Sequence, residues 1–117
     1  MSGLHIAILG LGEAGSRFVN DLVKLGVHVS GWDPNPKREL HPDVRFSKNN
    51  QDACRLADII FSVNLSSVSE DVARDVLPVL DSKKVYAEMN TSSPEMKIQI
   101  GTILQPTGVQ FADVAIM

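Results

Sequence analysis

Cysteine is almost absent from this sequence. Cys54 is the single cysteine, so no disulfide can form within the chain and a thiol-rich metal cluster is excluded. The residues around it, 50–57, have a helical pattern, and we interpret Cys54 as a small packed side chain rather than a nucleophile. This cysteine usage is typical of a reduced, cytoplasmic setting.

Long hydrophobic runs are also lacking. The apolar run at residues 4–11 has about eight residues, whereas a membrane-spanning helix needs roughly 18 or more. No basic segment precedes this run, and no small-residue cleavage site follows it. We therefore expect neither a secretory signal nor a membrane partner.

The chain has no excess of charge of one sign. Its net charge is −3, and its 11 lysine and arginine residues are scattered rather than clustered, which argues against a nucleic-acid partner. Hydrophobic residues make up 44% and charged residues 21% of the 117 residues. These values are typical of a globular protein, and the length predicts one domain, residues 1–117, with one core.

Strand-like and helix-like segments alternate along the chain. The expected strands are residues 4–9, 27–32, 44–46, 58–63, 84–89 and 109–116, and the expected helices are residues 13–25, 49–56, 69–80 and a segment that starts at Ser93 and Pro94. Such alternation with short connections predicts an α/β fold, a doubly wound Rossmann fold. The predicted sheet is six-stranded and mostly parallel, in the order 3-2-1-4-5-6, with helices on both faces.

Two of these helices carry specific expectations. The inward face of the first helix is predicted to be Ala14, Phe18, Leu22 and Leu25. The third helix is predicted to start at Ser69 as its N-cap, because two acidic residues follow that serine.

A glycine motif lies where the first strand meets the first helix. Gly10, Gly12 and Gly15 have the spacing G-x-G-x-x-G, and Asp33 stands at the end of the second strand. The first glycine permits a tight turn, the second lets backbone approach a diphosphate, and the third lets the helix press on the sheet. Backbone N–H groups at the helix start would bind the phosphates of a dinucleotide, and the Asp33 carboxylate would accept hydrogen bonds from its adenosine ribose.

Charged residues near this motif bear on the choice between NAD and NADP. Asp33 would repel a 2′-phosphate, which favours NAD. Lys37 and Arg38 follow closely and could meet such a phosphate, so NADP stays open, although we interpret both as solvated charges on a short helical turn. Glu13 would lie beside the diphosphate and is tolerable only if it points to solvent.

Over its whole length the sequence resembles the 6-phosphogluconate and 3-hydroxyisobutyrate dehydrogenases, also called β-hydroxyacid dehydrogenases. That family opens with a strand and Gly-Leu-Gly-x-Met-Gly, and residues 6–15 match it with Ala14 in place of Met. The resemblance places Asp33 at the adenosine-ribose selector and Val63, Asn64 and Leu65 in the loop that covers the adenine and ribose.

The resemblance extends to a motif after the fifth strand. Residues 88–94 match Asp-x-Ser-Thr-x-x-Pro, with Asn90 in place of Ser, and this loop lies near the nicotinamide ribose in the family. The implied cofactor-binding residues are Gly10, Leu11, Gly12, Glu13, Ala14, Gly15, Asp33, Val63, Asn64, Leu65, Asn90 and Thr91.

The resemblance also implies what this chain would lack. Residues 111–117 enter the family's substrate-carboxylate motif, but Met117 stands where that motif has Ser. Family members continue with a helical domain that supplies a catalytic Lys, and we assign Lys97 to solvent and His5 and His28 to structural roles. The resemblance therefore implies a β-hydroxyacid oxidoreductase whose cofactor-binding piece has no catalytic residues of its own and lacks turnover.

Three alternatives remain at this stage. The chain could be a non-catalytic NAD(H)-binding sensor or regulatory module, which would share the glycine motif and Asp33. It could bind another nucleotide such as FAD, or be an interaction domain that has lost its ligand. Without a second domain, apolar surface near the sixth strand would favour self-association, so a homo-oligomer is also expected.

Overall fold

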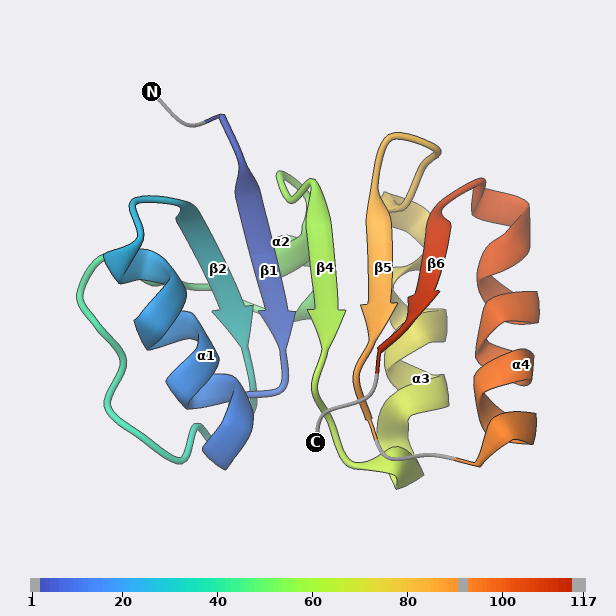
Figure 1. The fold of residues 1–117 in the computed structure, drawn as a ribbon, viewed down its shortest axis with the longest axis horizontal. Coiled ribbons are helices and arrows are strands. Elements are labelled where there is room, and N and C mark those ends of the chain that lie inside the picture. Colours follow the sequence, from blue (N-terminus) through green and yellow to red (C-terminus); the bar gives the residue numbers. More distant parts are fainter. Residues whose placement is uncertain (1–2, 91–92, 115–117) are drawn as a thin grey trace.

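The sheet carries the fold. The computed structural model describes residues 3–90 and 93–114, and within this part of the chain six strands form one sheet. The strands are β1 (His5–Leu9), β2 (His28–Trp32), β3 (Arg45–Phe46), β4 (Ile59–Ser62), β5 (Val85–Glu88) and β6 (Gln110–Asp113). Their order is β3-β2-β1-β4-β5-β6 and every pairing is parallel, which confirms the predicted doubly wound Rossmann arrangement (Figure 1).

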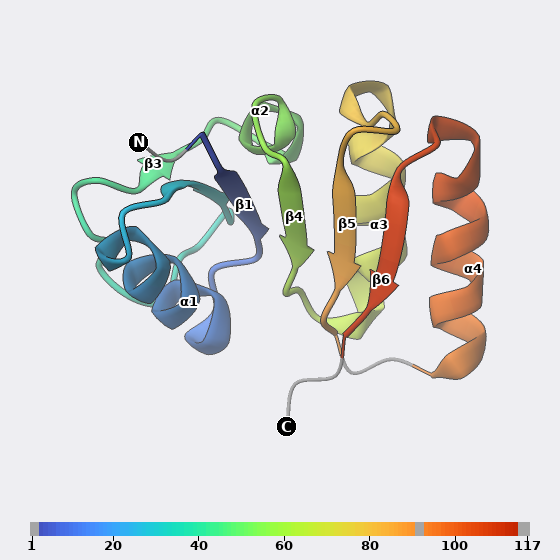
Figure 2. The ribbon, with the colours of Figure 1, turned by 45° about the horizontal axis from the view of Figure 1, so that its top comes forward.

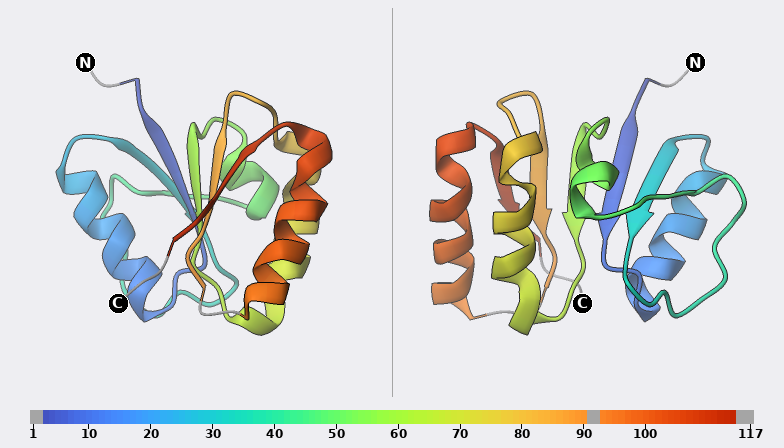
Figure 3. Two further views of the ribbon diagram at one scale, coloured as in Figure 1. Left: turned by 45° about the vertical axis from the view of Figure 1, so that its right-hand side comes forward. Right: turned by 180° about the vertical axis from the view of Figure 1, so that it is seen from behind.

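Helices cover both faces of the sheet, as predicted. They are α1 (Glu13–Lys24), α2 (Asn50–Cys54), α3 (Ser66–Val76) and α4 (Pro94–Leu104), with 3₁₀ turns η1 (Leu77–Val79) and η2 (Gln105–Thr107). Figure 1 shows α1 in front of the sheet, and the view from behind in Figure 3 shows α2, α3 and α4 on the opposite face. None of the described helices is long and apolar enough to cross a membrane.

Each face has its own hydrophobic core. The core on the α1 face is built from Ile6, Ile8, Leu11, Val19, Val29 and Val44. The core on the other face includes Ala7, Leu9, Ile60, Val76, Tyr86, Ile100 and Leu104. Because β1 contributes to both cores, its continuous apolar run is explained by burial on both faces.

The predicted inward face of α1 is partly wrong. Ala14 is exposed and Leu25 lies beyond the helix with 77% of its surface exposed, whereas the buried residues are Gly15, Ser16 and Val19. Apolar periodicity missed this face because two of its three buried residues are small or polar. Gly15 is there for close contact, and the Ser16 hydroxyl donates to the carbonyl of Leu11 at 2.6 Å.

The predicted start of the third helix is also wrong. Helix α3 begins at Ser66, with Leu65 as an N-cap that makes no side-chain hydrogen bond. Ser69 is buried inside the helix, where its hydroxyl donates to the carbonyl of Ser66 at 2.9 Å. By contrast, Ser93 caps α4 as predicted, because its hydroxyl accepts the N–H of Met96 at 3.2 Å.

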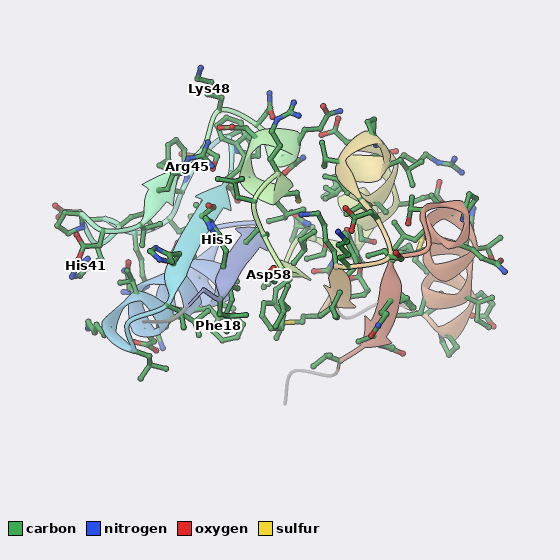
Figure 4. All side chains as sticks on the ribbon, turned by 90° about the horizontal axis from the view of Figure 1, so that it is seen from above. His5, Phe18, His41, Arg45, Lys48 and Asp58 are labelled. Atoms are coloured by element: carbon green, nitrogen blue, oxygen red, sulfur yellow. The ribbon has the colours of Figure 1, made fainter. Side chains whose placement is uncertain are left out.

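The amino-terminal edge of the sheet holds the two strand histidines. The His5 and His28 rings stack with centroids 5.9 Å apart, and His5 Nε2 lies 2.7 Å from the Ser30 hydroxyl. Figure 4 looks onto this edge and shows His5 close to Asp58, whose carboxylate accepts the backbone N–H of His5 at 2.9 Å. This edge lies opposite the turn at residues 10–12 between β1 and α1, called the glycine turn below. The described residues contain no cluster of three or more potential metal ligands.

Candidate functional site

The carboxyl ends of β2, β4 and β5 and the start of α1 border a cavity of about 560 Å³. Strand ends and the start of α1 gather at the lower edge in Figures 1 and 2. From the expected binding set the cavity is lined by Gly12, Glu13, Ala14, Gly15, Asp33, Val63, Asn64, Leu65 and Asn90. Thr91 and Met117 lie outside the described residues.

Two of the glycines are required by the protein itself. Gly10 has φ = 106°, and a Cβ there would lie 2.3 Å from the Val63 carbonyl oxygen. A Cβ on Gly15 would lie 1.8 Å from the carbonyl oxygen of Gly10. Both distances are far below a van der Waals contact, so these glycines let the turn form and bring α1 against it.

Gly12 is different because the protein does not need its missing side chain. A Cβ at this position would meet no atom within 4 Å, and the residue has ordinary extended backbone angles, φ = −71° and ψ = −157°. It is the N-cap of α1, and the helical bonding starts from Ser16 N to Gly12 O at 2.9 Å. The N–H groups of residues 13–15 therefore emerge at the helix end beside the cavity, where an anion can accept them.

Asp33 holds the glycine turn in place. Its Oδ2 accepts the N–H of Leu11 at 2.7 Å, and its Oδ1 accepts the N–H of Asn35 at 2.8 Å. A carboxylate has about four lone-pair sites, so these bonds leave acceptor capacity toward the cavity. Leu11 does not line the cavity, because its side chain is fully buried against Gly31.

Hydrogen-bonded polar side chains lie at the carboxyl ends of β4 and β5. The Ser62 hydroxyl accepts Asn64 Nδ2 at 2.9 Å and Asn90 Nδ2 at 3.4 Å. Asn90 donates its backbone N–H to Glu88 Oε1 at 3.1 Å, while Asn90 Oδ1 is a buried acceptor with no partner among the described residues. Glu88 is fully buried, and this burial raises the pKa of its carboxyl group above the ordinary value.

Lys97 does not point to solvent, contrary to the expectation from the sequence. Only 11% of its side chain is exposed, and Nζ donates to the Glu88 carbonyl at 3.2 Å and to Asp113 Oδ1 at 2.6 Å. The start of α4 therefore lies over the ends of β5 and β6. This ammonium group is used in joining the helix to those two strands.

Of the two cations expected to be solvated, Arg38 is instead in an ion pair, whereas the Lys37 side chain is exposed as expected. The Glu13 side chain is 68% exposed, as its position required, but it is paired with Arg38 at 2.7 Å. Lys37 lines the cavity, and its backbone N–H donates to the carbonyl of Leu11 at 2.9 Å. The loop after β2 is thus tied to the glycine turn, with no helical turn at residues 37–38.

Some lining residues were not expected from the sequence. They are Pro34, Asn35, Val68 and Met89. The sequence did not predict Val68 in the lining, because the acidic residues after Ser69 suggested a helix start there. Helix α3 starts three residues earlier, at Ser66. Pro34 and Asn35 come after Asp33, and Met89 comes after the last residue of β5, so their position at the carboxyl edge of the sheet was the available signal.

The geometry agrees with a comparison to known protein families. A family model described as the NAD binding domain of 6-phosphogluconate dehydrogenase matches residues 5–117. The chain belongs to this family. A curated relative, the cytokine-like nuclear factor N-PAC of Danio rerio, is 27% identical over 116 residues, which cover 93% of this chain and 25% of that protein.

Solved structures share the fold of this NAD-binding domain. Imine reductase from Myxococcus stipitatus is 22% identical, with TM-scores of 0.86 for a variant in complex with NAD⁺ and 0.85 for a complex with NADP⁺. The 3-hydroxyisobutyrate dehydrogenase of Mycobacterium tuberculosis, solved with L-serine, is 23% identical with a TM-score of 0.84, over 97% of this chain and 40% of that one. The chain thus spans 25% of the curated relative and about 40% of these solved chains.

Proposed function

We propose that this domain binds NAD or NADP, with NAD preferred, and that the N–H groups of residues 13–15 receive the diphosphate. The observation that carries this proposal is the contrast among the glycines. At Gly10 and Gly15 the protein's own backbone occupies the space that a Cβ would need. A Cβ on Gly12 would instead enter open space beside the cavity. Because Gly12 also lines the cavity at the start of α1, its missing side chain is explained by a ligand that approaches its backbone.

The remaining lining residues fit the rest of a dinucleotide. We assign Asp33 to the adenosine ribose, because its carboxylate has acceptor sites left and its charge disfavours a 2′-phosphate. Val63, Asn64 and Leu65 would cover the adenine and ribose. Asn90, whose buried oxygen has no partner among the described residues, would offer an acceptor to a hydroxyl of the nicotinamide ribose; Thr91 belongs to the same assignment.

As part of a longer protein, the domain would serve an oxidoreductase that acts on the CH–OH group of a β-hydroxyacid. The bound nicotinamide supplies the hydride chemistry, and this chain holds and orients the cofactor. Support comes from the family match and from the likeness in fold to a 3-hydroxyisobutyrate dehydrogenase. We further propose a cytoplasmic location, and self-association at the apolar hollow that Ile98 and Phe111 line beside β6.

A second candidate function is a non-catalytic NAD(H)-binding module. The observation that favours it is the name of the curated relative, which is called a nuclear factor. The two candidates share the cofactor site and differ in turnover. Incubation of the complete protein with NAD⁺ and a panel of short β-hydroxyacids separates them, because NADH appears only if the protein is an oxidoreductase.

Binding is tested by calorimetry with NAD⁺, NADH, NADP⁺ and NADPH. Gly12→Val places a side chain where the diphosphate would lie, and Gly3→Val is the matched control because its Cβ also meets nothing within 4 Å. We expect the unaltered chain to bind NAD⁺ and Gly12→Val to weaken binding by about tenfold or more, equivalent to about 1.4 kcal/mol. Circular dichroism checks that both variants fold.

The proposal fails if the unaltered chain binds none of the four dinucleotides at millimolar concentration. It also fails if Gly12→Val and Gly3→Val, both folded, bind them as well as the unaltered chain does.

A further inference from the structure

An ion pair lies beside the proposed dinucleotide cavity. Arg38 Nη2 donates to Glu13 Oε2 at 2.7 Å, and the two residues come from segments that lie far apart in the sequence. Glu13 is the first residue of α1 and lines the cavity, while Arg38 stands in the loop after β2. The pair therefore joins the diphosphate side of the cavity to the side that holds Asp33.

This pairing changes the charge that a ligand meets. An unpaired Glu13 carboxylate would repel a diphosphate at the helix end, and Arg38 offsets that repulsion. In turn, Glu13 occupies the guanidinium group that would otherwise be the best partner for a phosphate, since arginine binds phosphate through paired N–H groups. Lys37, which also lines the cavity, is a cation with no side-chain partner among the described residues.

We propose that Glu13 sets the preference for NAD over NADP by holding the Arg38 guanidinium in an ion pair and away from a 2′-phosphate on the adenosine ribose. This inference rests on the proposed dinucleotide function and adds a selectivity residue to it. Glu13 and Asp33 thus act from two sides: Asp33 repels the 2′-phosphate directly, and Glu13 withholds a cation from it. The backbone bond from Lys37 to Leu11 ties the segment that carries Arg38 to the turn before α1.

Because both side chains of the ion pair are exposed, Arg38 can exchange Glu13 for another anion. The side chains are 39% exposed for Arg38 and 68% exposed for Glu13, and exposed ion pairs contribute little stability. A variant without the Glu13 charge should therefore keep its fold. It would release Arg38 to a phosphate, whose charge of about −1.5 to −2 near neutral pH exceeds that of one carboxylate.

The test compares dissociation constants of Glu13→Gln for NADP⁺ and NAD⁺ by calorimetry. We expect the dissociation constant for NADP⁺ to fall about five- to tenfold relative to that for NAD⁺. Asp81→Asn is the charge-matched control, since Asp81 is exposed in the turn before β5, at the amino-terminal edge of the sheet. That variant should leave both constants unchanged.

A double variant identifies the cation. Adding Arg38→Gln to Glu13→Gln should abolish the gain for NADP⁺, because the released guanidinium is then missing. Equal changes for both dinucleotides in Glu13→Gln, or a gain that survives in the double variant, would overturn the selectivity role while leaving the cofactor site intact. If the unaltered chain binds neither dinucleotide, the proposed function falls and the selectivity role with it.

Discussion

Asp33 shows how one side chain serves the turn before it serves any ligand. Its two oxygens receive the N–H groups of Leu11 and Asn35, so the carboxylate fixes the glycine turn that lies across from it. The sequence predicts that Asp33 lies at the end of the second strand and that its carboxylate contacts the adenosine ribose of a dinucleotide. It could not reveal the bond to Leu11, because that bond depends on how two loops meet in three dimensions.

Glu88 is a second residue whose surroundings matter more than its type. Its carboxyl group is fully buried at the end of β5, with Oε1 on the N–H of Asn90 and Oε2 without a partner among the described residues. Burial raises its pKa from an ordinary value of 4.5. The folded chain therefore keeps this proton at pH values where the unfolded chain has lost it.

From this shift we expect a pH-dependent gain in stability for Glu88→Gln. The free energy of unfolding of the unaltered chain should decline as pH rises from 4.5 through the raised pKa of the folded state. Gln cannot ionise, so the variant should be more stable at pH 7, by about 1 kcal/mol or more, and equal to the unaltered chain near pH 4. Urea denaturation at both pH values measures this.

Glu39→Gln is the control for that experiment, because Glu39 is exposed in the loop after β2. It should show no such dependence on pH. If Glu88→Gln is less stable than the unaltered chain at pH 7, the buried carboxyl group is not a cost to the fold.

Among the elements, helix α1 makes two close contacts with backbone carbonyl groups of the turn that precedes it. Gly15 brings the first turn of α1 against the carbonyl of Gly10, and Ser16 bonds the carbonyl of Leu11. Periodicity of apolar residues predicted the existence and length of α1 well, but it chose Ala14 and Leu25 for the inward face. Phe18 and Leu22 do pack against the core as predicted, but Gly15 and Ser16 are buried there too, and hydrophobic patterns do not record such residues.

The Gly15 contact gives a prediction for the stability of the whole chain. Gly15→Ala places a Cβ at 1.8 Å from the Gly10 carbonyl oxygen, so α1 must move off the turn, and we expect a loss of about 3 kcal/mol or more. Gly12→Ala adds the same methyl group into open space and should cost about 1 kcal/mol or less. Equal urea midpoints for the two variants would show that the close approach is not needed.

The boundary of α3 illustrates a second limit of the sequence. Acidic residues after Ser69 resembled a first turn, yet α3 begins at Ser66 behind an N-cap, Leu65, that makes no side-chain bond. Because the helix starts earlier, Val68 reaches the cavity. An unexpected lining residue thus follows directly from a boundary that local propensity placed three residues late.

At the scale of the whole molecule, the sequence predicted the strand order and the location of the site. Alternating strands and helices with short connections allow few topologies, and parallel strands collect their carboxyl ends at one edge. The glycine motif then needed only its place between β1 and α1. Long-range pairings such as Glu13 with Arg38, or Lys97 with Asp113, were beyond reach because no local pattern encodes them.

Dinucleotide binding at the start of α1 can be followed residue by residue in an ¹⁵N NMR titration of the chain with NAD⁺. We expect the largest shift changes at the amide groups of residues 12–15, with smaller ones at Asn64 and Asn90, and none at His5 or His28 on the opposite edge. An unchanged spectrum at millimolar NAD⁺, or changes confined to the edge that holds His5 and His28, would show that no dinucleotide binds at the start of α1.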